Sequence, residues 1–528
     1  MKIYFLLLIF LLGGFVTNVF SSNHYIDKNA TGINDGTSWL NAWQSFSAID
    51  WNNINPGDNI FISGGIDSLI YNEKLDILAS GNPGNPITIT KGNDSGHSGR
   101  VIIDVDKMFV NALEITSQNY ITVSNLFLRN SFDSVIKIKS SLNIRIENSY
   151  IHTTVRSGIN VSQNENITIS GCKITTDQII YHQTDGIYSQ NNVNNIYENN
   201  NIIISNRDPD GHDDCIQSYR DASLTIKNNY TEQNNSKESN AQGIYITTPL
   251  GSDTTRIYNN IFNATLSSSN GITFNGLTGS SSARVQIIGN TVYGENLSSQ
   301  YRIKATFDPI IKNNIGYSVN GNAILRLIDV SFSDPSNIDN NIWKSSDNEP
   351  ISIDGHEESW TSWQTSGFDL HSYTTNPYFN DIFNNDFSLQ ASSDGIDNGQ
   401  SLYPPYNFDY DGTSRPRGSG WDIGAYESDF TASIKNDDRQ PIGYRLFQNY
   451  PNPFNPSTNI SFTLPVDSKV RIAVYNLLGE EVVELANSEF ISGKHIINFD
   501  ATEYTSGVYF YRLKTNEFVE TKKMILMR

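Results

Sequence analysis

The segment TDGIYS at residues 184–189 represents a pattern that recurs through the middle of the chain. Related segments are DSVIKI, RSGINV, DDCIQS, AQGIYI and SNGITF, which begin at residues 133, 156, 213, 241 and 269. Their third positions lie 23 to 29 residues apart along the chain. A period of this size is typical of a solenoid, in which each repeat buries its apolar face against its neighbours.

A second element follows in each repeat, as in IRIEN, ITISG, TIKNN and IIKNN. Short β-branched runs separated by Gly, Asn and Ser predict strands. One polar position recurs as Asn125, Asn148, Gly171, Asn199, Asn228, Asn259, Gly289 and Asn313. We expect its amides to hydrogen-bond from coil to coil at a turn. The sequence therefore predicts an all-β fold, a right-handed parallel β-helix, with a β-sandwich array as the alternative.

The repeat region, roughly residues 100–330, resembles the pectate-lyase-like superfamily of right-handed β-helices. The segment that begins HYIDKNATG at residue 24 resembles the N-terminal cap of many secreted members. The segment DYDGTSRPRGSGWDIGAYE at 409–427 is similar to the closing motif of bacterial β-helix proteins. Both motifs indicate architecture and leave the activity open. We expect the β-helix, with its cap and closing segment, to occupy residues 23–427.

The pattern changes after a polar linker at residues 428–441. The runs YRLFQNYPNPFNPSTNISFTLP, KVRIAVYNLLGEEVVEL and SGVYFYRLKTNEFVETKKMILMR predict a small antiparallel β-sandwich. This segment resembles a type A sorting domain of the type IX secretion system, which we place at residues 442–528. The resemblance implies that this machinery is a partner, and that the protein is exported across an outer membrane and then released or attached to the surface.

The N-terminal end predicts export independently. Residues 1–22 combine Lys2, a short apolar run and small residues, which is typical of a cleaved signal peptide, with a membrane anchor as the alternative. We expect an extracellular monomer with no transmembrane segment after cleavage. A net charge of −20 at pH 7 argues against nucleic acid as a partner. Cys172 and Cys215 give no disulfide framework, and we expect both to be small apolar fillers, with a single bridge as the alternative.

Acidic side chains gather on two neighbouring coils. Aligning the repeats places Asp185 and Asp214 at the same position on successive coils, which lie ~4.8 Å apart in a parallel sheet. Asp213 adjoins Asp214, and His212 precedes them. Like charges at this spacing raise at least one pKa, so a cation, a basic group or a shared proton must compensate. We take this acidic cluster as the candidate site.

The first hypothesis for the site is an inverting glycosidase. TDGI and DDCI resemble motifs of the polygalacturonase-like glycosidases, and this resemblance implies that Asp185, Asp213 and Asp214 supply the general acid and the water-activating carboxylates. The substrate-gripping motif of that family corresponds to Arg302-Ile303-Lys304, about one coil too late and ~14 Å from Asp214 by coil spacing. Gln242 stands where that family has a histidine.

The second hypothesis is a polysaccharide lyase that binds Ca²⁺ as its only cofactor. Asp185, Asp213 and Asp214 would then be metal ligands, because oxygen-rich clusters suit Ca²⁺. Further acidic ligands would be Asp208 or Asp210, and candidate bases are Arg220, Lys237 and Arg207, with His212 as an alternative proton shuttle.

The third hypothesis is structural, in which the aspartates cap turns of a carbohydrate-binding or adhesin-like surface without chemistry. Strand alternation predicts that Tyr188, Gln217 and Tyr245 point outward beside the acidic column, where they could stack against sugar rings. We therefore predict a secreted β-helix protein whose partner is an acidic or neutral polysaccharide. Cleavage at the acidic face is the favoured function, and binding without cleavage is the alternative.

Overall fold

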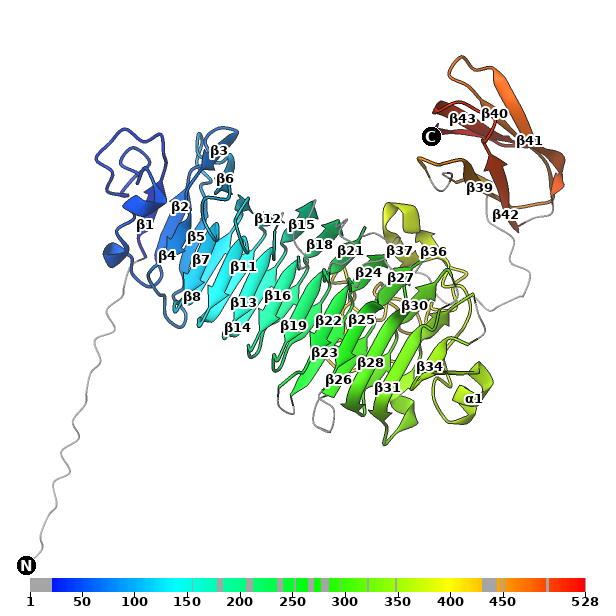
Figure 1. The fold of residues 1–528 in the computed structure, drawn as a ribbon, viewed down its shortest axis with the longest axis horizontal. Coiled ribbons are helices and arrows are strands. Elements are labelled where there is room, and N and C mark those ends of the chain that lie inside the picture. The colour runs from blue at the N-terminus through cyan, green and yellow to red at the C-terminus, as the bar shows by residue number, and fades with distance from the viewer. Residues whose placement is uncertain are drawn as a thin grey trace, which may run out of the picture. The chain divides into compact units, whose positions relative to one another are not determined.

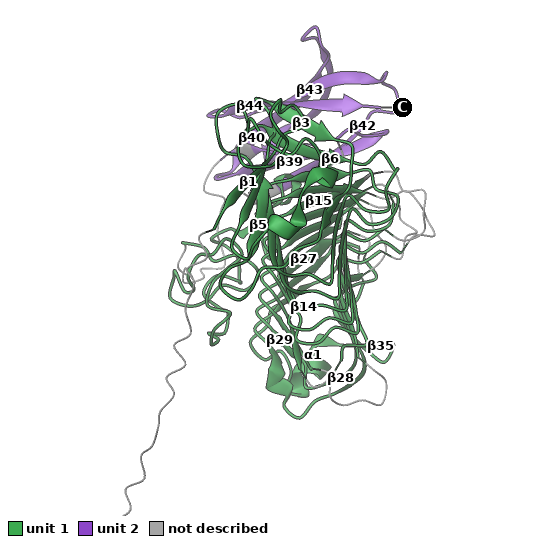
Figure 2. Ribbon diagram, turned by 90° about the vertical axis from the view of Figure 1, so that its left-hand side faces the viewer, with its two compact units in different colours: residues 1–433 green, residues 434–528 purple. Residues whose placement is uncertain are grey.

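The computed structural model describes residues 21–153, 155–177, 184–205, 212–234, 241–250, 253–264, 270–276, 284–295, 297–320, 322–346, 349–429, 444–447, 449, 452–490 and 493–527. The chain divides into two compact units, residues 1–433 and 434–528 (Figure 2). The division falls inside the predicted linker 428–441. The predicted signal peptide lies outside the described residues except for its last two positions.

Unit 1 is a stack of coils, each of which passes through three long sheets (Figure 1). Sheet 1 contains β1 (Asn23–Ile26), β2 (Asn59–Ile62), β5 (Ile87–Lys91), β8 (Asn119–Ser124), β11 (Leu142–Glu147), β14 (Glu165–Ser170), β17 (Ile196–Glu198), β20 (Thr225–Lys227), β23 (Thr254–Tyr258), β26 (Arg284–Ile288), β29 (Ile310–Lys312) and β32 (Ile338–Asp339). Its strands pair in parallel in this order.

Sheet 2 contains β3 (Ser68–Tyr71), β6 (Arg100–Asp104), β9 (Phe127–Arg129), β12 (Tyr150–Thr153), β15 (Lys173–Asp177), β18 (Asn201–Ser205), β21 (Tyr230–Gln233), β24 (Ile261–Ala264), β27 (Thr291–Gly294), β30 (Ile315–Ser318) and β33 (Ile342–Lys344). Sheet 3 contains β4 (Leu75–Ile77), β7 (Leu113–Thr116), β10 (Ile136–Lys139), β13 (Ile159–Ser162), β16 (Ile187–Gln190), β19 (Ile216–Tyr219), β22 (Ile244–Thr247), β25 (Asn270–Asn275), β28 (Ser299–Phe307), β31 (Leu325–Ser331) and β34 (Ile351–Ile353). The edge strand of sheet 3, β35 (His356–Glu358), pairs antiparallel with β34.

Short elements complete the described part of unit 1: η1 (Phe46–Ala48), η2 (Trp51–Asn53), η3 (Pro335–Asn337), α1 (Trp360–Thr365), β36 (Phe379–Asp381), η4 (Ile382–Asn384) and β37 (Asp386–Leu389). Among the described residues, no helix is long and apolar enough to cross a membrane. The predicted right-handed parallel β-helix is confirmed.

Coil stacking in strict register builds the core. Ile159, Ile187, Ile216 and Ile244 are direct partners on four neighbouring strands of sheet 3, and none of them is exposed. Full burial of one isoleucine side chain contributes about 1.5–3 kcal/mol. Because each side chain is covered by the coils before and after it, the apolar core exists only when the coils are stacked. Cys172 and Cys215 are free and buried in the same core, as predicted.

The recurring Asn and Gly column has a different role from the predicted one. Its members, Asn125, Asn148, Gly171, Asn199, Asn228, Asn259, Gly289 and Asn313, all have positive φ, between 46° and 64°. Only glycine adopts this left-handed conformation freely, and asparagine tolerates it better than most residues. The column therefore turns the chain from sheet 1 to sheet 2, and the prediction of a coil-to-coil amide ladder at these positions was wrong.

From Asn200 on, an amide ladder runs one residue later in each coil. Asn229 donates from its backbone N and its Nδ2 to Asn260 Oδ1, at 3.0 and 2.9 Å. Asn260 in turn donates to Asn290 Oδ1 from the same two groups, at 2.9 and 3.0 Å. The ladder consists of Asn200, Asn229, Asn260, Asn290, Asn314 and Asn341, all essentially unexposed. These bonds satisfy polar groups that the turn would otherwise bury without partners.

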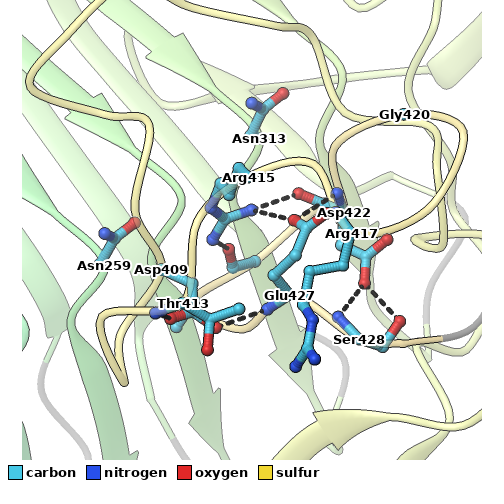
Figure 3. Close-up of polar contacts among 12 residues, drawn as sticks. Asn259, Asn313, Asp409, Thr413, Arg415, Arg417, Gly420, Asp422, Glu427 and Ser428 are labelled. Carbon is cyan, nitrogen blue, oxygen red and sulfur yellow. Dashed lines mark hydrogen bonds and ion pairs between the residues drawn. The ribbon is translucent and has the colours of Figure 1, made fainter.

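The predicted closing motif packs against this corner of the β-helix (Figure 3). Buried Arg415 donates to Glu427 Oε2 at 3.2 Å and to the carbonyl oxygens of Asp422 and Gly424. Asn259, a member of the left-handed column, donates from Nδ2 to the Phe408 carbonyl oxygen. The closing segment is thus held by its own buried ion pair and by the turn asparagines.

Unit 2 is the predicted antiparallel sandwich. One sheet contains β38 (Arg445–Leu446), β39 (Ser457–Leu464) and β42 (Gly493–Asp500), and the other contains β41 (Glu481–Phe490), β40 (Ser468–Tyr475), β43 (Gly507–Lys514) and β44 (Val519–Leu526). Alternate side chains meet in a core that includes Phe462, Val474, Tyr511 and Met524.

Candidate functional site

The acidic cluster lies where each coil turns into sheet 3. Asp214 donates its backbone N–H to Asp185 Oδ1 at 3.0 Å, so the two residues occupy equivalent positions on successive coils, as aligned. Gln242 occupies that position on the next coil and donates its backbone N–H to Asp214 Oδ1 at 2.8 Å. The carboxyl groups of Asp185 and Asp214 therefore each cap the equivalent backbone N–H of the following coil.

Asp213 caps the coil in the opposite direction. Its Oδ1 accepts the backbone N–H of Thr184 at 2.7 Å, and its carbonyl oxygen accepts Gln233 Nε2 at 2.8 Å. Asp185 is 4% exposed, and neither Asp213 nor Asp214 is exposed. All three carboxyl groups are consequently out of direct reach of a ligand on the surface.

The pKa values of Asp185 and Asp214 are both raised. Burial raises the pKa of Asp185 to about 8. Burial, followed by the charge of Asp185, raises the pKa of Asp214 well above its usual value. Because a buried carboxyl favours its neutral form, burial disfavours adjacent negative charges on Asp185 and Asp214.

His212 connects the buried stack to the surface. Its Nδ1 lies 3.3 Å from Asp214 Oδ2, and its side chain is 30% exposed. Nδ1 itself is buried, so the exposed part of the ring lies away from Asp214. Burial lowers the pKa of His212, which favours a neutral imidazole able to accept a proton. The ring centroid lies 5.3 Å from that of Tyr245.

The predicted outward column is a continuous feature of sheet 3. Tyr188, Gln217 and Tyr245 are direct partners on β16, β19 and β22, and each is partly exposed while the residues on either side of it are buried. The same column continues through Thr273 and Arg302. Outward aromatic and amide side chains thus lie next to His212.

Two hydrogen bonds, both made by Asn275, join Arg302 to Tyr245. Arg302 Nη1 donates to Asn275 Oδ1 at 2.9 Å, and Asn275 Nδ2 donates to the Tyr245 hydroxyl at 3.3 Å. Asn275 was missed in the sequence, although it follows Thr273 by two positions and strand alternation places it on the same face. Lys304 is the direct partner of Asn275 on β28.

Two other predicted site residues, Gln242 and Arg220, lie apart from these hydrogen bonds. Gln242 is only 7% exposed, so most of its side chain lies beneath the surface. Arg220 is exposed at the turn after β19, where its backbone N–H bonds to Thr247 and φ is 59°. Arg207, Asp208, Asp210 and Lys237 lie outside the described residues.

The acidic trio does not fit a Ca²⁺ site as it is placed. One oxygen of each carboxyl already accepts a backbone N–H, and the groups are buried. Within the described ranges, no group of three or more His, Cys, Asp or Glu side chains could hold a metal ion. The roles of Asp185, Asp213 and Asp214 in catalysis or metal binding remain predictions.

Fold and site define a right-handed parallel β-helix protein with a separate C-terminal β-sandwich. The profile of the secretion system C-terminal sorting domain family matches residues 448–527, so the sandwich is a sorting domain of that family. This domain indicates type IX secretion, with release or attachment at the outer-membrane surface. No curated protein matches the chain in a sequence comparison.

Several solved structures are similar to this chain at low sequence identity. Pectate lyase Pel9A is 14% identical, with a TM-score of 0.47, over 78% of this chain and 97% of that one. The lacto-N-biosidase of Eubacterium ramulus is 12% identical, with a TM-score of 0.34, over 63% and 67%. The surface adhesin PfbA of Streptococcus pneumoniae is 12% identical, with a TM-score of 0.33, over 65% and 95%.

Proposed function

We propose that the protein binds a polysaccharide across the outer face of sheet 3 and cleaves it beside His212 and Asp214. The contact between a buried acid and a partly exposed base carries this proposal. His212 Nδ1 lies 3.3 Å from Asp214 Oδ2, and the His212 ring lies against Tyr245 on the outward column. An acid and a base in close contact therefore adjoin a face suited to sugars.

The outward column has the composition of a sugar-binding surface. Tyr188 and Tyr245 supply aromatic rings that can pack on the apolar C–H face of a sugar, and Gln217 between them supplies an amide for hydroxyl groups. Neighbouring strands repeat every ~4.8 Å along the solenoid. A glycan chain that ran along this axis would meet successive coils, so several sugar residues could be held at once.

Asp214 and His212 have different roles in the proposed reaction. Asp214 is too buried to touch a sugar, but its Oδ2 can accept the Nδ1–H of His212, which leaves Nε2 as the exposed proton acceptor. His212 is exposed enough to reach a ligand, and its lowered pKa keeps it able to accept a proton. Cleavage of a glycosidic bond by hydrolysis or by elimination needs such a transfer, which typically contributes ~10²–10⁴-fold to the rate.

The test is a panel of acidic and neutral polysaccharides assayed for new reducing ends and for unsaturated ends that absorb ultraviolet light. Wild-type protein is compared with Asp214→Asn, in which an amide oxygen can still accept the Gln242 N–H. The matched control is Asp221→Asn, another carboxyl that is buried (2% exposed) and bonds to Ser189 and Ser218 at the other end of the strand.

We expect Asp214→Asn to keep the wild-type thermal midpoint and glycan binding but to lose cleavage at least ~100-fold. The control variant should cleave normally. Equal cleavage by the wild type and Asp214→Asn would remove Asp214 from the mechanism.

A second candidate function is binding without cleavage, as in an adhesin. The capping bonds favour it, because Asp185, Asp213 and Asp214 each have a structural role that requires no chemistry. In that case the wild-type protein would retain a glycan of the panel and release no products. Truncating Tyr188 and Tyr245 to Ala would then weaken retention, while Asp214→Asn would leave it unchanged.

A further inference from the structure

A cleft lies at the corner between sheets 1 and 2, near the N-terminal end of the β-helix. Its volume is about 770 Å³, within the ~300–1,000 Å³ range typical of small-molecule sites. Its lining includes Asn125 and Asn148, two members of the left-handed column that turns the chain at this corner. Sheet 3 does not form this corner, so the cleft is separate from the face proposed for cleavage.

Two loops that are bonded to each other and to the surrounding chain form one side of the cleft. One loop precedes β3 and the other precedes β6, and the backbone N–H of Arg100 donates to the carbonyl oxygen of Asp67 at 2.7 Å. Trp39 holds the second loop, because its ring stacks on His97 with centroids 3.9 Å apart and its Nε1 donates to Asp94 Oδ2. These contacts keep this side of the cleft in place without a ligand.

Two stacked aromatic rings contribute an apolar surface to the cleft. Phe127 on β9 and Tyr150 on β12 are direct partners with ring centroids 4.5 Å apart and planes 9° apart, and both are partly exposed. Further along sheet 2 the chain covers such rings itself: Tyr293 on β27 is 5% exposed and Phe387 of β37 packs against it. The open surface of Phe127 and Tyr150 suits the C–H groups of a sugar.

Polar groups without partners lie beside these rings. Within the described part of the chain, the side chains of Asp67, Arg100 and Asn148 have no hydrogen-bond or ion-pair partner, and all three are exposed. Lys91, in contrast, donates from Nζ to the Ser98 carbonyl oxygen. The free groups are therefore an acceptor, a donor and an amide that can do both.

We propose that this cleft binds a neutral saccharide, as a second site that holds a glycan without cleaving it. Sugar hydroxyl groups donate and accept hydrogen bonds, so neighbouring hydroxyls can pair with the Asp67 carboxylate and the Arg100 guanidinium together. The carboxylate of an acidic sugar only accepts hydrogen bonds, and it would face the negative charge of Asp67. The cleft binds its ligand whether or not sheet 3 cleaves a glycan, because the two sites lie on different faces.

The experiment titrates the full-length protein with cellohexaose, xylohexaose, mannohexaose and hexagalacturonate by calorimetry. Wild type is compared with Asp67→Ala and Arg100→Ala, which change exposed side chains and should leave the thermal midpoint unchanged. The matched control is Arg284→Ala, because Arg284 is also exposed and also begins a strand, β26, but lies outside the cleft. A double variant, Tyr188→Ala with Tyr245→Ala, reports binding on sheet 3.

We expect at least one neutral hexasaccharide to bind to the wild type. Asp67→Ala and Arg100→Ala should each weaken this binding about 10-fold, the effect of losing one hydrogen bond to a charged group. Arg284→Ala and the double tyrosine variant should retain the binding, because neither changes the cleft.

Three results would overturn the second site while leaving the proposed function standing: equal binding by wild type and Arg100→Ala, loss of binding in the double tyrosine variant alone, or hexagalacturonate as the one probe whose binding needs Arg100. Failure of all three neutral probes to bind would overturn it as well, whatever sheet 3 does to an acidic polymer.

Discussion

The amide ladder at the corner between sheets 1 and 2 makes a strong prediction about stability. Asn260→Ala removes a side chain whose Oδ1 accepts two bonds from Asn229 and whose Nδ2 donates to Ile226 O, Tyr258 O and Asn290 Oδ1. The backbone N–H of Asn229 loses its acceptor in a fully buried position, which costs about 1–3 kcal/mol. The other bonds have alternative partners and add about 1–2 kcal/mol together.

The expected destabilisation is therefore about 2–5 kcal/mol. Guanidinium unfolding followed by tryptophan fluorescence measures it for unit 1 alone, because all seven tryptophans precede the sorting domain. The control is Asn228→Gly, one residue earlier, where φ is 54° and Oδ1 has no hydrogen-bond partner within the described structure. Glycine adopts that φ freely, so the control should change stability by less than about 0.5 kcal/mol.

The reasoning is refuted if Asn260→Ala costs less than Asn228→Gly. That result would mean that the ladder bonds are replaced by water or that the left-handed column holds the corner together by itself.

Two further predictions concern titration and the closing segment. The pKa of Asp185 is about 8 in the folded chain and about 4 when unfolded, so its protonation stabilises the β-helix fully below pH 4, and this contribution is lost as the pH rises through about 8. The thermal midpoint should fall between pH 6.5 and 8, because this group lowers the free energy of unfolding by at most ~1.4 kcal/mol per pH unit; an equally steep fall in Asp185→Asn would assign the effect to other groups. Glu427→Ala leaves the Arg415 guanidinium, with 2% of its side chain exposed, without its ion-pair partner and should destabilise unit 1 by about 3–5 kcal/mol. Unfolding by guanidinium measures this loss, and an unchanged midpoint would show that the guanidinium is solvated after all.

The β-helix was predictable because its pattern is repeated many times. A residue such as Ile187 or Ile216 recurs at the same phase in every coil, and that phase can point only inward when the coils stack. The role of the asparagines was not predictable, because most coils carry two in succession. Asn228 and Asn229 are chemically identical in the sequence, and only the backbone shows that the first adopts positive φ and the second forms the ladder.

The position of the candidate site was predictable, but its chemistry was not. Repeat alignment placed Asp185 on Asp214, yet it gave no sign that both are buried and cap backbone N–H groups. Counting coils placed Arg302 three coils after Asp214, and the strand pairing agrees with that separation. Asn275, which joins Arg302 to Tyr245 within that interval, could not be found by counting.

The most direct test of a cleaving face on sheet 3 is the turnover of the polysaccharide panel by wild type and His212→Gln, at equal thermal midpoints. His212 contacts both Asp214 and Tyr245, so it connects the buried acid to the outer face of sheet 3. The account predicts that the wild type cleaves at least one polysaccharide of the panel and that His212→Gln binds it equally well but cleaves it at least ~100-fold more slowly. Equal turnover by the two proteins, or binding with no cleavage by either, would contradict it.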